Sequence, residues 1–334
     1  MNGIKGHCKA VGITSFPRIH ITLIGMNQDG YRINGSVGFS ISGPKIDVYF
    51  EESESIEIID EREVKFTEQE KTRLQHVLTE SINKFSLKKG IKYTICSNVM
   101  PHYGLGSNTA IYMSCIEALF LINEIDYIHN DIIRASKRGG TSGVGINTYF
   151  EGGFIFDVGI KSSKESNFIP SSIADRNGKT PLVIHKCKLP DWKIGICIPT
   201  FIRNKSEQEE VNFFKQHCPI DKNSIEAILY EAVYGITSSV IENDYENFCK
   251  SVNSIQLTRW KYLEREQYGD ELIKLEQKIK TWGADCVGMS SLGPILFFTG
   301  INIDNIIESV SINIPEAICY NVSFNNQGRI INYD

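Results

Sequence analysis

"HYGLGSNTA", residues 102–110, stands between the apolar segment "YTICSNVM" (93–100) and the strongly apolar "IYMSCIEALFLI" (111–122). The first apolar segment predicts a strand and the second a long helix over about 107–123. Glycine lets the backbone approach an anion closely, and the free amides of a helix's first turn point at such an anion. The stretch therefore predicts either an anion-binding loop or only a tight turn that caps the helix. It is not a Walker loop, because no Gly-Lys-Ser/Thr follows.

The composition is that of a globular protein with room for two domains. The chain has 334 residues, of which 41% are hydrophobic and 22% charged, and its formal charge is -5. Its positive charges are scattered, which argues against a nucleic-acid partner. No apolar run reaches the roughly 18 residues of a membrane span, and the first residues lack the apolar core of a secretory signal. Nine cysteines without a CxxC pair indicate reduced thiols in a cytoplasmic protein.

The order of the predicted elements favours an α+β fold. Strands dominate the first 60 residues, and "TEQE" (67–70) is a capping box for a helix that we expect to end at Gly90. The polar segment 161–180 is the best domain boundary, which gives domains 1–180 and 181–334. In the second domain we expect two strands, then helices, then a final strand-helix-strand unit. The predicted helices cover 205–216, 222–242, 244–255 and 261–281.

A second glycine-rich loop, "KRGGTSGVG" (137–145), adds a cation to the same pattern. Arg138 stands beside flexible glycines and two hydroxyl groups, and arginine suits the two-pronged grip of phosphate or carboxylate. A mobile surface loop is the alternative reading. A third Gly/Ser turn, "GMSSLGP" (288–294), lies between a predicted helix and a strand.

Polar side chains also lie on two predicted neighbouring strands. Arg18 and His20 in "PRIHITL" (17–23) share one face, because side chains alternate along a strand, and Ile19 and Ile21 would face the core. Arg32 and Asn34 form a similar pair in "YRING" (31–35), although a lone arginine on a strand usually faces solvent. These polar pairs lie near the predicted anion-binding loop and so indicate a ligand-binding site.

Taken in order, these segments resemble the beta-ribofuranosylaminobenzene 5'-phosphate synthase family of the GHMP kinase superfamily. The similarity covers nearly the whole chain, roughly residues 18–294. Its most specific parts are "RGGTSG" (138–143), "EGGF" (151–154) with Asp157 after it, and "PSS" (170–172). "GLGS" (104–107) alone is typical of the whole superfamily.

The resemblance implies a ribosomal-S5-like N-terminal domain, a ferredoxin-like C-terminal domain and a site between them. It implies a decarboxylating C-glycosyltransferase, which joins phosphoribosyl diphosphate to an aromatic or heteroaromatic acid and releases diphosphate and carbon dioxide. Magnesium is the implied cofactor, with Asp157 as a candidate ligand of the metal or of a ribose hydroxyl. A homodimer is expected from the family alone.

The same resemblance implies the site residues. Arg18, His20, Arg32, Asn34 and Asp157 are the expected catalytic residues. Phosphoribosyl diphosphate is expected on four loops, at Gly104, Leu105, Gly106, Ser107, Asn108 and Thr109, at Arg138, Gly139, Gly140, Thr141, Ser142 and Gly143, at Ser171 and Ser172, and at Ser290 and Ser291.

Departures from the family pattern leave the acceptor open. Asn34 and Ser36 stand where the family usually has aspartate and glycine, and Leu292 stands where an aromatic residue is common. The acceptor is then 4-aminobenzoate or 4-hydroxybenzoate, as in methanopterin biosynthesis, or a pyrazole-type acid, as in C-nucleoside biosynthesis. A GHMP-type kinase using ATP is a rival, but "SGVG" (142–145) has Gly145 where many such kinases carry an aspartate. A non-catalytic ligand-binding relative is the third reading.

Overall fold

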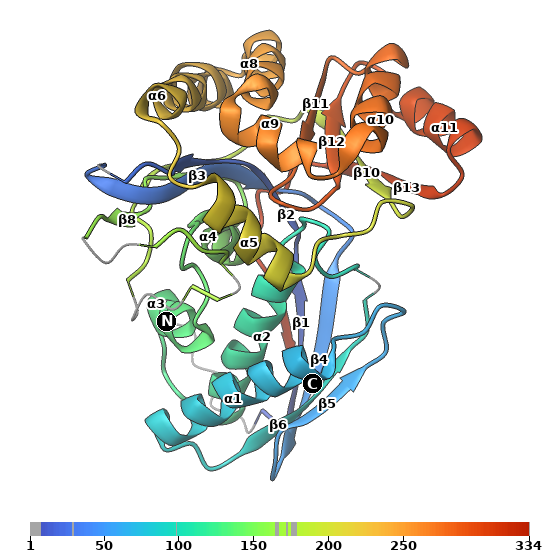
Figure 1. Cartoon of the computed structure of the whole chain (residues 1–334). Helices are drawn as coiled ribbons and strands as arrows, with labels where there is room; N and C mark the ends of the chain where they lie inside the picture. Colours follow the sequence, from blue (N-terminus) through green and yellow to red (C-terminus); the bar gives the residue numbers. More distant parts are fainter. Residues whose placement is uncertain are drawn as a thin grey trace.

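The computed structural model describes residues 8–28, 30–97, 99–163, 167–171, 173–174 and 179–333. Ser172, one of the expected binding residues, lies outside these ranges. Three β-sheets and the helices between them form the molecule (Figure 1), which confirms the expected α+β class.

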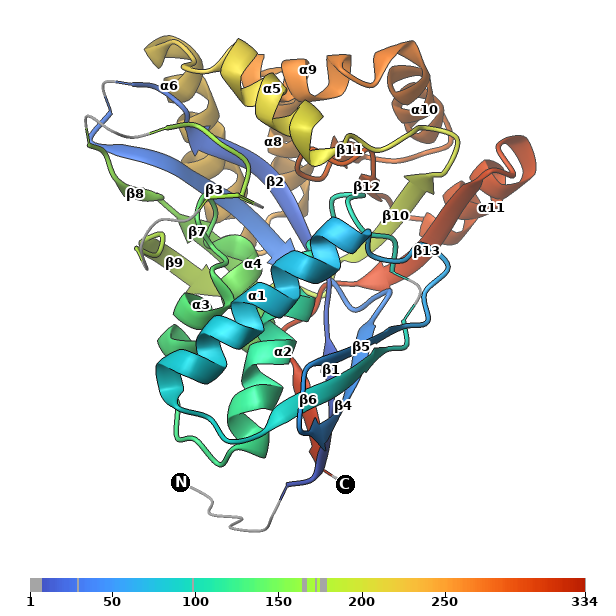
Figure 2. The ribbon, with the colours of Figure 1, turned by 60° about the horizontal axis from the view of Figure 1, so that its bottom comes forward.

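The first sheet has the strand order β14-β1-β4-β6-β5. Its strands are β1 (Ala10–Ser15), β4 (Ile46–Ser53), β5 (Glu57–Asp60), β6 (Gly90–Ile95) and β14 (Ile330–Tyr333). Helix α2 (Ser107–Ile122) packs against β1, β4 and β6, and α1 (Glu68–Phe85) packs against α2 (Figure 2). Most of α2 is buried on all sides, as its sequence requires, so it forms a rigid support for the loop that precedes it.

Helix α1 begins as predicted and ends earlier than predicted. Thr67 and Glu70 form the expected capping box. The helix ends at Ser86, which adopts a left-handed conformation with φ 51°, and not at Gly90, which opens β6 instead. Because the helix already ends at its cap Ser86, three residues, 87–89, remain to turn the chain into the strand.

The second sheet has the order β2-β3-β7-β9, with β8 paired to β3. Its strands are β2 (Arg18–Gly25), β3 (Arg32–Ser40), β7 (Phe154–Asp157), β8 (Ile160–Lys161) and β9 (Val183–Cys187). Helix α4 (Val144–Glu151) covers one face, with α3 (His129–Ser136) beyond it, and helices from later in the chain cover the other (Figure 1). Strand β2 is therefore buried on both sides, and His20 is as inaccessible as its isoleucine neighbours.

The sequence did not predict helix α4, because it begins inside the second glycine-rich loop. Gly143 and Gly145 lower the helix propensity of this segment. Packing compensates for that cost, since Val144, Ile146 and Tyr149 are all buried. The helix starts directly at the cavity described below.

The third sheet has the order β11-β12-β10-β13, and its chain order is β-α-β-β-α-β. This is the ferredoxin-like arrangement expected for the second half. Its strands are β10 (Lys193–Pro199), β11 (Cys286–Met289), β12 (Leu296–Thr299) and β13 (Ala317–Ser323), and α11 (Ile303–Asn313) joins the last two.

A run of helices connects β10 to β11. They are α5 (Glu207–His217), α6 (Lys222–Tyr230), the π-helix η1 (Glu231–Thr237), α7 (Ser238–Glu242), α8 (Tyr245–Leu257), α9 (Arg259–Glu266) and α10 (Gly269–Thr281). The expected helix over 261–281 is thus two helices, α9 and α10. Helices α6 and α9 lie on the outer face of β2 and so bring the second half of the chain onto the first.

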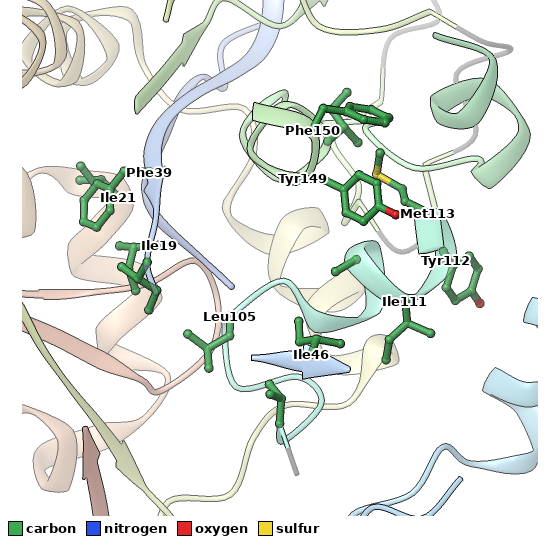
Figure 3. Packing of buried hydrophobic residues seen from close by; sticks show 14 of the residues in the cluster. Ile19, Ile21, Phe39, Ile46, Leu105, Ile111, Tyr112, Met113, Tyr149 and Phe150 are labelled. Carbon is green, nitrogen blue, oxygen red and sulfur yellow. The ribbon is translucent and has the colours of Figure 1, made fainter. Parts of the chain in front are cut away.

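Strand pairing does not separate the chain at residue 180. Strand β9 pairs with β7, and the last strand, β14, pairs with β1. One hydrophobic core cluster extends from Val11 to Phe324 and includes side chains of all three sheets. Figure 3 shows part of it, where α2, α4, β2 and β3 meet. In the described part of the chain, no helix is long and apolar enough to cross a membrane.

Candidate active site

A polar cavity of about 120 Å³ lies where the loops before α2 and α4 meet strand β2 and the turn between β11 and β12. Helices α5 and α9 close its remaining side. Its walls are Arg18, His20, Leu23, His102, Gly104, Gly106, Ser107, Asn108, Thr109, Arg138, Thr141, Ser142, Pro170, Ser171, Glu210, Phe214, Glu264, Ser291, Leu292 and Gly293. A second cavity of about 300 Å³ adjoins it, and the two share His102, Asn108 and Arg138.

The loop before α2 has the geometry of an anion-binding turn. Gly104 and Gly106 have φ angles of 98° and 75°, which favour glycine, and a Cβ on Gly104 would lie 2.3 Å from the Ser290 carbonyl oxygen. Gly106 is the N-cap of α2 and offers no side chain to the first-turn amides. Leu105 points away into the core, directly before α2 (Figure 3). The first turn of α2 is thereby presented to the cavity.

Two arginines face this cavity without a carboxylate partner among the described residues. Arg18 donates to the Gly104 carbonyl oxygen, and Arg138 donates to Thr109 Oγ1 from Nε (3.3 Å) and Nη2 (3.1 Å). Burial, and then the neighbouring charge of Arg138, lowers the pKa of Arg18 to about 10. Burial also lowers the pKa of Arg138. A pair of like charges withdrawn from water is a strong attractor for an anion.

Asp157 holds the second loop from behind and does not line the cavity. Its Oδ2 accepts hydrogen bonds from Ser36 Oγ (2.5 Å) and Gly143 N (2.9 Å), and its Oδ1 accepts one from Gly159 N (2.9 Å). Ser36 Oγ also lies 2.7 Å from Ser142 Oγ, which does line the cavity. Burial raises the pKa of Asp157 to about 6. The geometry thus gives Asp157 a positioning role in place of the expected contact with substrate or metal.

Strand β2 is joined to the third loop by backbone and hydroxyl groups. His20 N donates to Ser290 Oγ (3.0 Å), Ser290 Oγ donates to the Gly104 carbonyl (2.8 Å), and Ser291 N donates to the His20 carbonyl (2.9 Å). Ser291 lines the cavity, whereas Ser290 is fully buried behind it. Burial and the charges of Arg18 and Lys261 hold the pKa of the His20 imidazole well below its usual value. His20 is therefore neutral, and its buried Nδ1 has no partner in the described structure.

Arg32 and Asn34 lie away from this cavity. Arg32 donates to the carbonyl oxygens of Val158 (2.8 Å) and Gly159 (2.6 Å) and so fixes the turn after β7. Asn34 is buried with φ 61°, and its amide atoms have no hydrogen-bond partner in the described structure. Neither residue lines the cavity. Gly139, Gly140 and Gly143 also shape the second loop without lining the cavity.

The sequence did not predict the wall that α5 and α9 contribute. Glu210 and Phe214 come from α5, and Glu264 comes from α9. Glu264 is buried and lies 2.6 Å from Lys261, whose Nζ also donates to the Met289 carbonyl (2.8 Å). No local motif marks these residues, because acidic and aromatic residues are common on any amphipathic helix.

His102, which belongs to the glycine-rich stretch 102–110, also lines the cavity and pairs with Glu70. We expect this pair to stabilise the fold. His102 Nε2 lies 2.6 Å from Glu70 Oε1. Burial alone would raise the pKa of Glu70, but hydrogen bonds from His102 and Thr67 lower it to about 2; the Glu70 hydrogen bond in turn raises the pKa of His102. Glu70→Gln should cost about 1 kcal/mol of unfolding free energy.

The loss of unfolding free energy in Glu70→Gln should depend on pH, because both partners titrate. The contribution of Glu70 is present above its ordinary pKa of 4.5 and is lost as the pH falls towards 2. The contribution of His102 is present below its ordinary pKa of 6.5 and is lost as the pH rises through its raised value. Urea unfolding of both proteins from pH 3 to 9 should therefore show the largest difference between about pH 4.5 and 6.5. A difference independent of pH would contradict the ion pair.

In a comparison with known proteins, the similar sequences described below share one name. No protein-family model matches the chain. Beta-ribofuranosylphenol 5'-phosphate synthase from Methanothermobacter thermautotrophicus is 30% identical over 283 residues, which cover 84% of this chain and 85% of the relative. The protein of the same name from Archaeoglobus fulgidus is 31% identical over 280 residues, or 84% of each chain.

Solved structures with the same fold include kinases and mevalonate diphosphate decarboxylases. Homoserine kinase from Cytophaga hutchinsonii aligns with a TM-score of 0.70 at 14% identity, over 99% of this chain and 100% of that one. Mevalonate diphosphate decarboxylase from Enterococcus faecalis aligns with a TM-score of 0.66 at 12% identity, over 98% and 99%. At these identities the likeness concerns the fold alone, and it confirms the GHMP-kinase-like architecture over the whole chain.

Proposed function

The chain belongs to the beta-ribofuranosylphenol 5'-phosphate synthase family, and from this premise we propose that it transfers a phosphoribosyl group to the ring carbon of an aromatic acid. The donor is phosphoribosyl diphosphate. Diphosphate and carbon dioxide leave, and the product is a C-riboside 5'-phosphate. The names of the relatives describe a phenol product, which favours 4-hydroxybenzoate over 4-aminobenzoate and over a pyrazole-type acid as the acceptor.

The observation that carries this proposal is the pair of arginines beside a helix N-terminus, neither of which forms an ion pair with a described carboxylate. Arg18 and Arg138 share one cavity with the first turn of α2 and the hydroxyl groups of Thr141 and Ser142. Withdrawing two guanidinium groups from water is costly, Glu207 and Glu210 offset that cost only for Arg138, and a bound polyanion would offset it for both arginines. A diphosphate offers the charge and the several acceptor oxygens that this wall requires.

The cavity also has apolar walls, which suit an aromatic ring. Leu23, Pro170, Phe214 and Leu292 all line it. A ribose with its diphosphate on the arginine wall would hold C1 towards these side chains. The acceptor ring would then approach C1 from the side opposite to the leaving group, as an in-line displacement needs.

The chemistry depends mainly on positioning and electrostatics. As the C1–oxygen bond breaks, its electron pair leaves with the diphosphate, where Arg18, Arg138 and the α2 amides stabilise the growing negative charge. The ring carbon that bears the carboxylate bonds to C1, and loss of carbon dioxide restores aromaticity. Neutral His20 lines the same cavity and adds no further positive charge to the arginine wall.

Magnesium, the expected cofactor, does not fit Asp157. Both carboxylate oxygens of Asp157 already accept hydrogen bonds from Ser36, Gly143 and Gly159. Within the described ranges no three His, Cys, Asp or Glu side chains group as metal ligands. In this proposal the arginines and backbone amides stabilise the leaving diphosphate, and magnesium and homodimerisation stay predictions from the sequence.

A direct assay tests the proposal. Purified protein is mixed with phosphoribosyl diphosphate, magnesium and, separately, 4-hydroxybenzoate, 4-aminobenzoate or an aminopyrazole carboxylate. Diphosphate release and a product mass equal to acceptor plus ribose phosphate minus carbon dioxide are expected with at least one acid. No product with any acceptor, together with ATP-dependent phosphorylation of an alcohol, would replace the proposal by the kinase.

A further inference from the structure

Glu210 is a cavity carboxylate whose hydrogen-bonding capacity is unused. The first turns of α5 carry three glutamates, and two of them are occupied: Glu207 pairs with Arg73 (2.5 Å), and Glu209 pairs with Arg203 (2.6 Å) and caps the helix. Glu210 lines the cavity, and the described residues give it neither a hydrogen bond nor an ion pair. A carboxylate left free in a ligand cavity is available to the ligand.

The surroundings of Glu210 raise the pKa of its carboxyl group to near neutral pH. Burial raises the pKa of the Glu210 carboxyl to about 7; Glu207 and Glu264 act in the same direction, and His102 and Arg138 oppose them. Tyr268 also faces Glu210. A group that gains and loses a proton near pH 7 suits proton transfer in a reaction.

Glu210 also lies on the same face of α5 as an aromatic wall of the cavity. Phe214 is four residues further along α5, so the two side chains share one face of the helix, and both line the cavity. Phe214 is buried against Trp260, with ring centroids 5.4 Å apart, which holds it as a fixed platform. A ring packed on Phe214 with its carboxylate-bearing carbon towards the arginine wall would direct its para substituent at Glu210.

Building on the proposed function, we propose that Glu210 takes the hydroxyl proton of a 4-hydroxybenzoate acceptor as the ring attacks C1, and returns it when carbon dioxide has left. The proton passes to the carboxylate, and the oxygen electron pair enters the ring as the carbon–C1 bond forms and the C1–diphosphate bond breaks. The intermediate is a dienone that still carries the carboxylate. Breaking the bond to carbon dioxide returns its electron pair to the ring and oxygen, and the phenolate recovers the proton from Glu210.

Glu210→Gln separates this role from simple binding. With 4-hydroxybenzoate, kcat should fall about 100- to 1,000-fold. With 4-aminobenzoate the fall should stay below about fivefold, because an amine donates its lone pair without first losing a proton. Ring-fluorinated 4-hydroxybenzoates, whose hydroxyl ionises more readily, should narrow the gap between the wild type and the variant. Glu226→Gln, which removes an exposed carboxylate from α6, is the matched control and should leave all rates unchanged.

The pH profile gives an independent readout. In the wild type, kcat with 4-hydroxybenzoate should decline below about pH 7, as Glu210 becomes protonated, and this decline should be absent in Glu210→Gln. Glu210→Asp, which keeps a carboxylate, should retain the decline at a reduced rate. If Glu210→Gln fails to fold, this variant decides the question.

The possible contrary results distinguish a failure of the Glu210 proposal from a failure of the proposed function. Equal losses with both acceptors and with the fluorinated acids would show that Glu210 only binds or positions, and would end the proton role. Full activity of Glu210→Gln, alongside an active wild type, would overturn this inference and leave the proposed function standing. An inactive wild type with every acid would overturn the proposed function, and this inference with it. If 4-aminobenzoate is no substrate, the fluorinated series decides.

Discussion

Arg138→Ala should lower kcat/KM for phosphoribosyl diphosphate about 100- to 1,000-fold, because it removes one of two guanidinium groups from the anion wall. Its thermal stability should change little. The variant loses the contacts of Arg138 with Thr109 and with the Tyr112 ring, whose centroid lies 5.2 Å from the guanidinium. It also relieves the repulsion between Arg138 and Arg18. Steady-state kinetics and a thermal unfolding curve measure the two effects on one sample.

Arg134→Ala is the matched control for this variant. Arg134 lies on α3, four residues before Arg138, and is exposed. It carries the same charge and should be replaceable without effect on either measurement. Wild-type turnover in Arg138→Ala would remove Arg138 from the site. A large fall in its unfolding temperature would show that the guanidinium supports the fold instead.

The parts of the site that could be predicted are those encoded locally. The two glycine-rich loops can be recognised in the sequence, because the glycine and hydroxyl residues that present backbone amides to an anion lie within a few positions of one another. The same holds for Arg18 and His20, which alternation places on one face of β2. The capping box at Thr67 was predicted correctly for the same reason.

The parts of the site that could not be predicted depend on contacts between residues that are far apart in the sequence. Asp157 is the last residue of the short strand β7, and nothing local shows that its oxygens accept hydrogen bonds from Ser36 and Gly143 of other segments. Arg32 likewise finds backbone carbonyls more than a hundred residues away. Glu210 and Glu264 reach the cavity only because α5 and α9 fold back to it. A single sequence contains no signal for such contacts.

Gly145→Asp should weaken binding of phosphoribosyl diphosphate about 10- to 100-fold, which corresponds to about 1.4 to 2.7 kcal/mol. Gly145 is the second residue of α4, and a Cβ there would lie 3.6 Å from Thr109 Cγ2 and 3.8 Å from Arg18 Nε. An aspartate therefore fits without a clash and places a carboxylate beside Arg18. The resulting ion pair neutralises the anion wall, so the variant should bind the donor poorly while its unfolding temperature stays level or rises.

The charge, rather than the added bulk, must cause this loss. Gly145→Asn adds a side chain of the same size without a negative charge, and it should keep most of the affinity measured by isothermal titration calorimetry. If asparagine weakens binding as much as aspartate does, the effect is steric and says nothing about Arg18. If aspartate leaves the affinity unchanged, Arg18 does not contact the donor's anion, and the glycine at this position no longer distinguishes a phosphoribosyl-diphosphate site from that of an aspartate-bearing kinase.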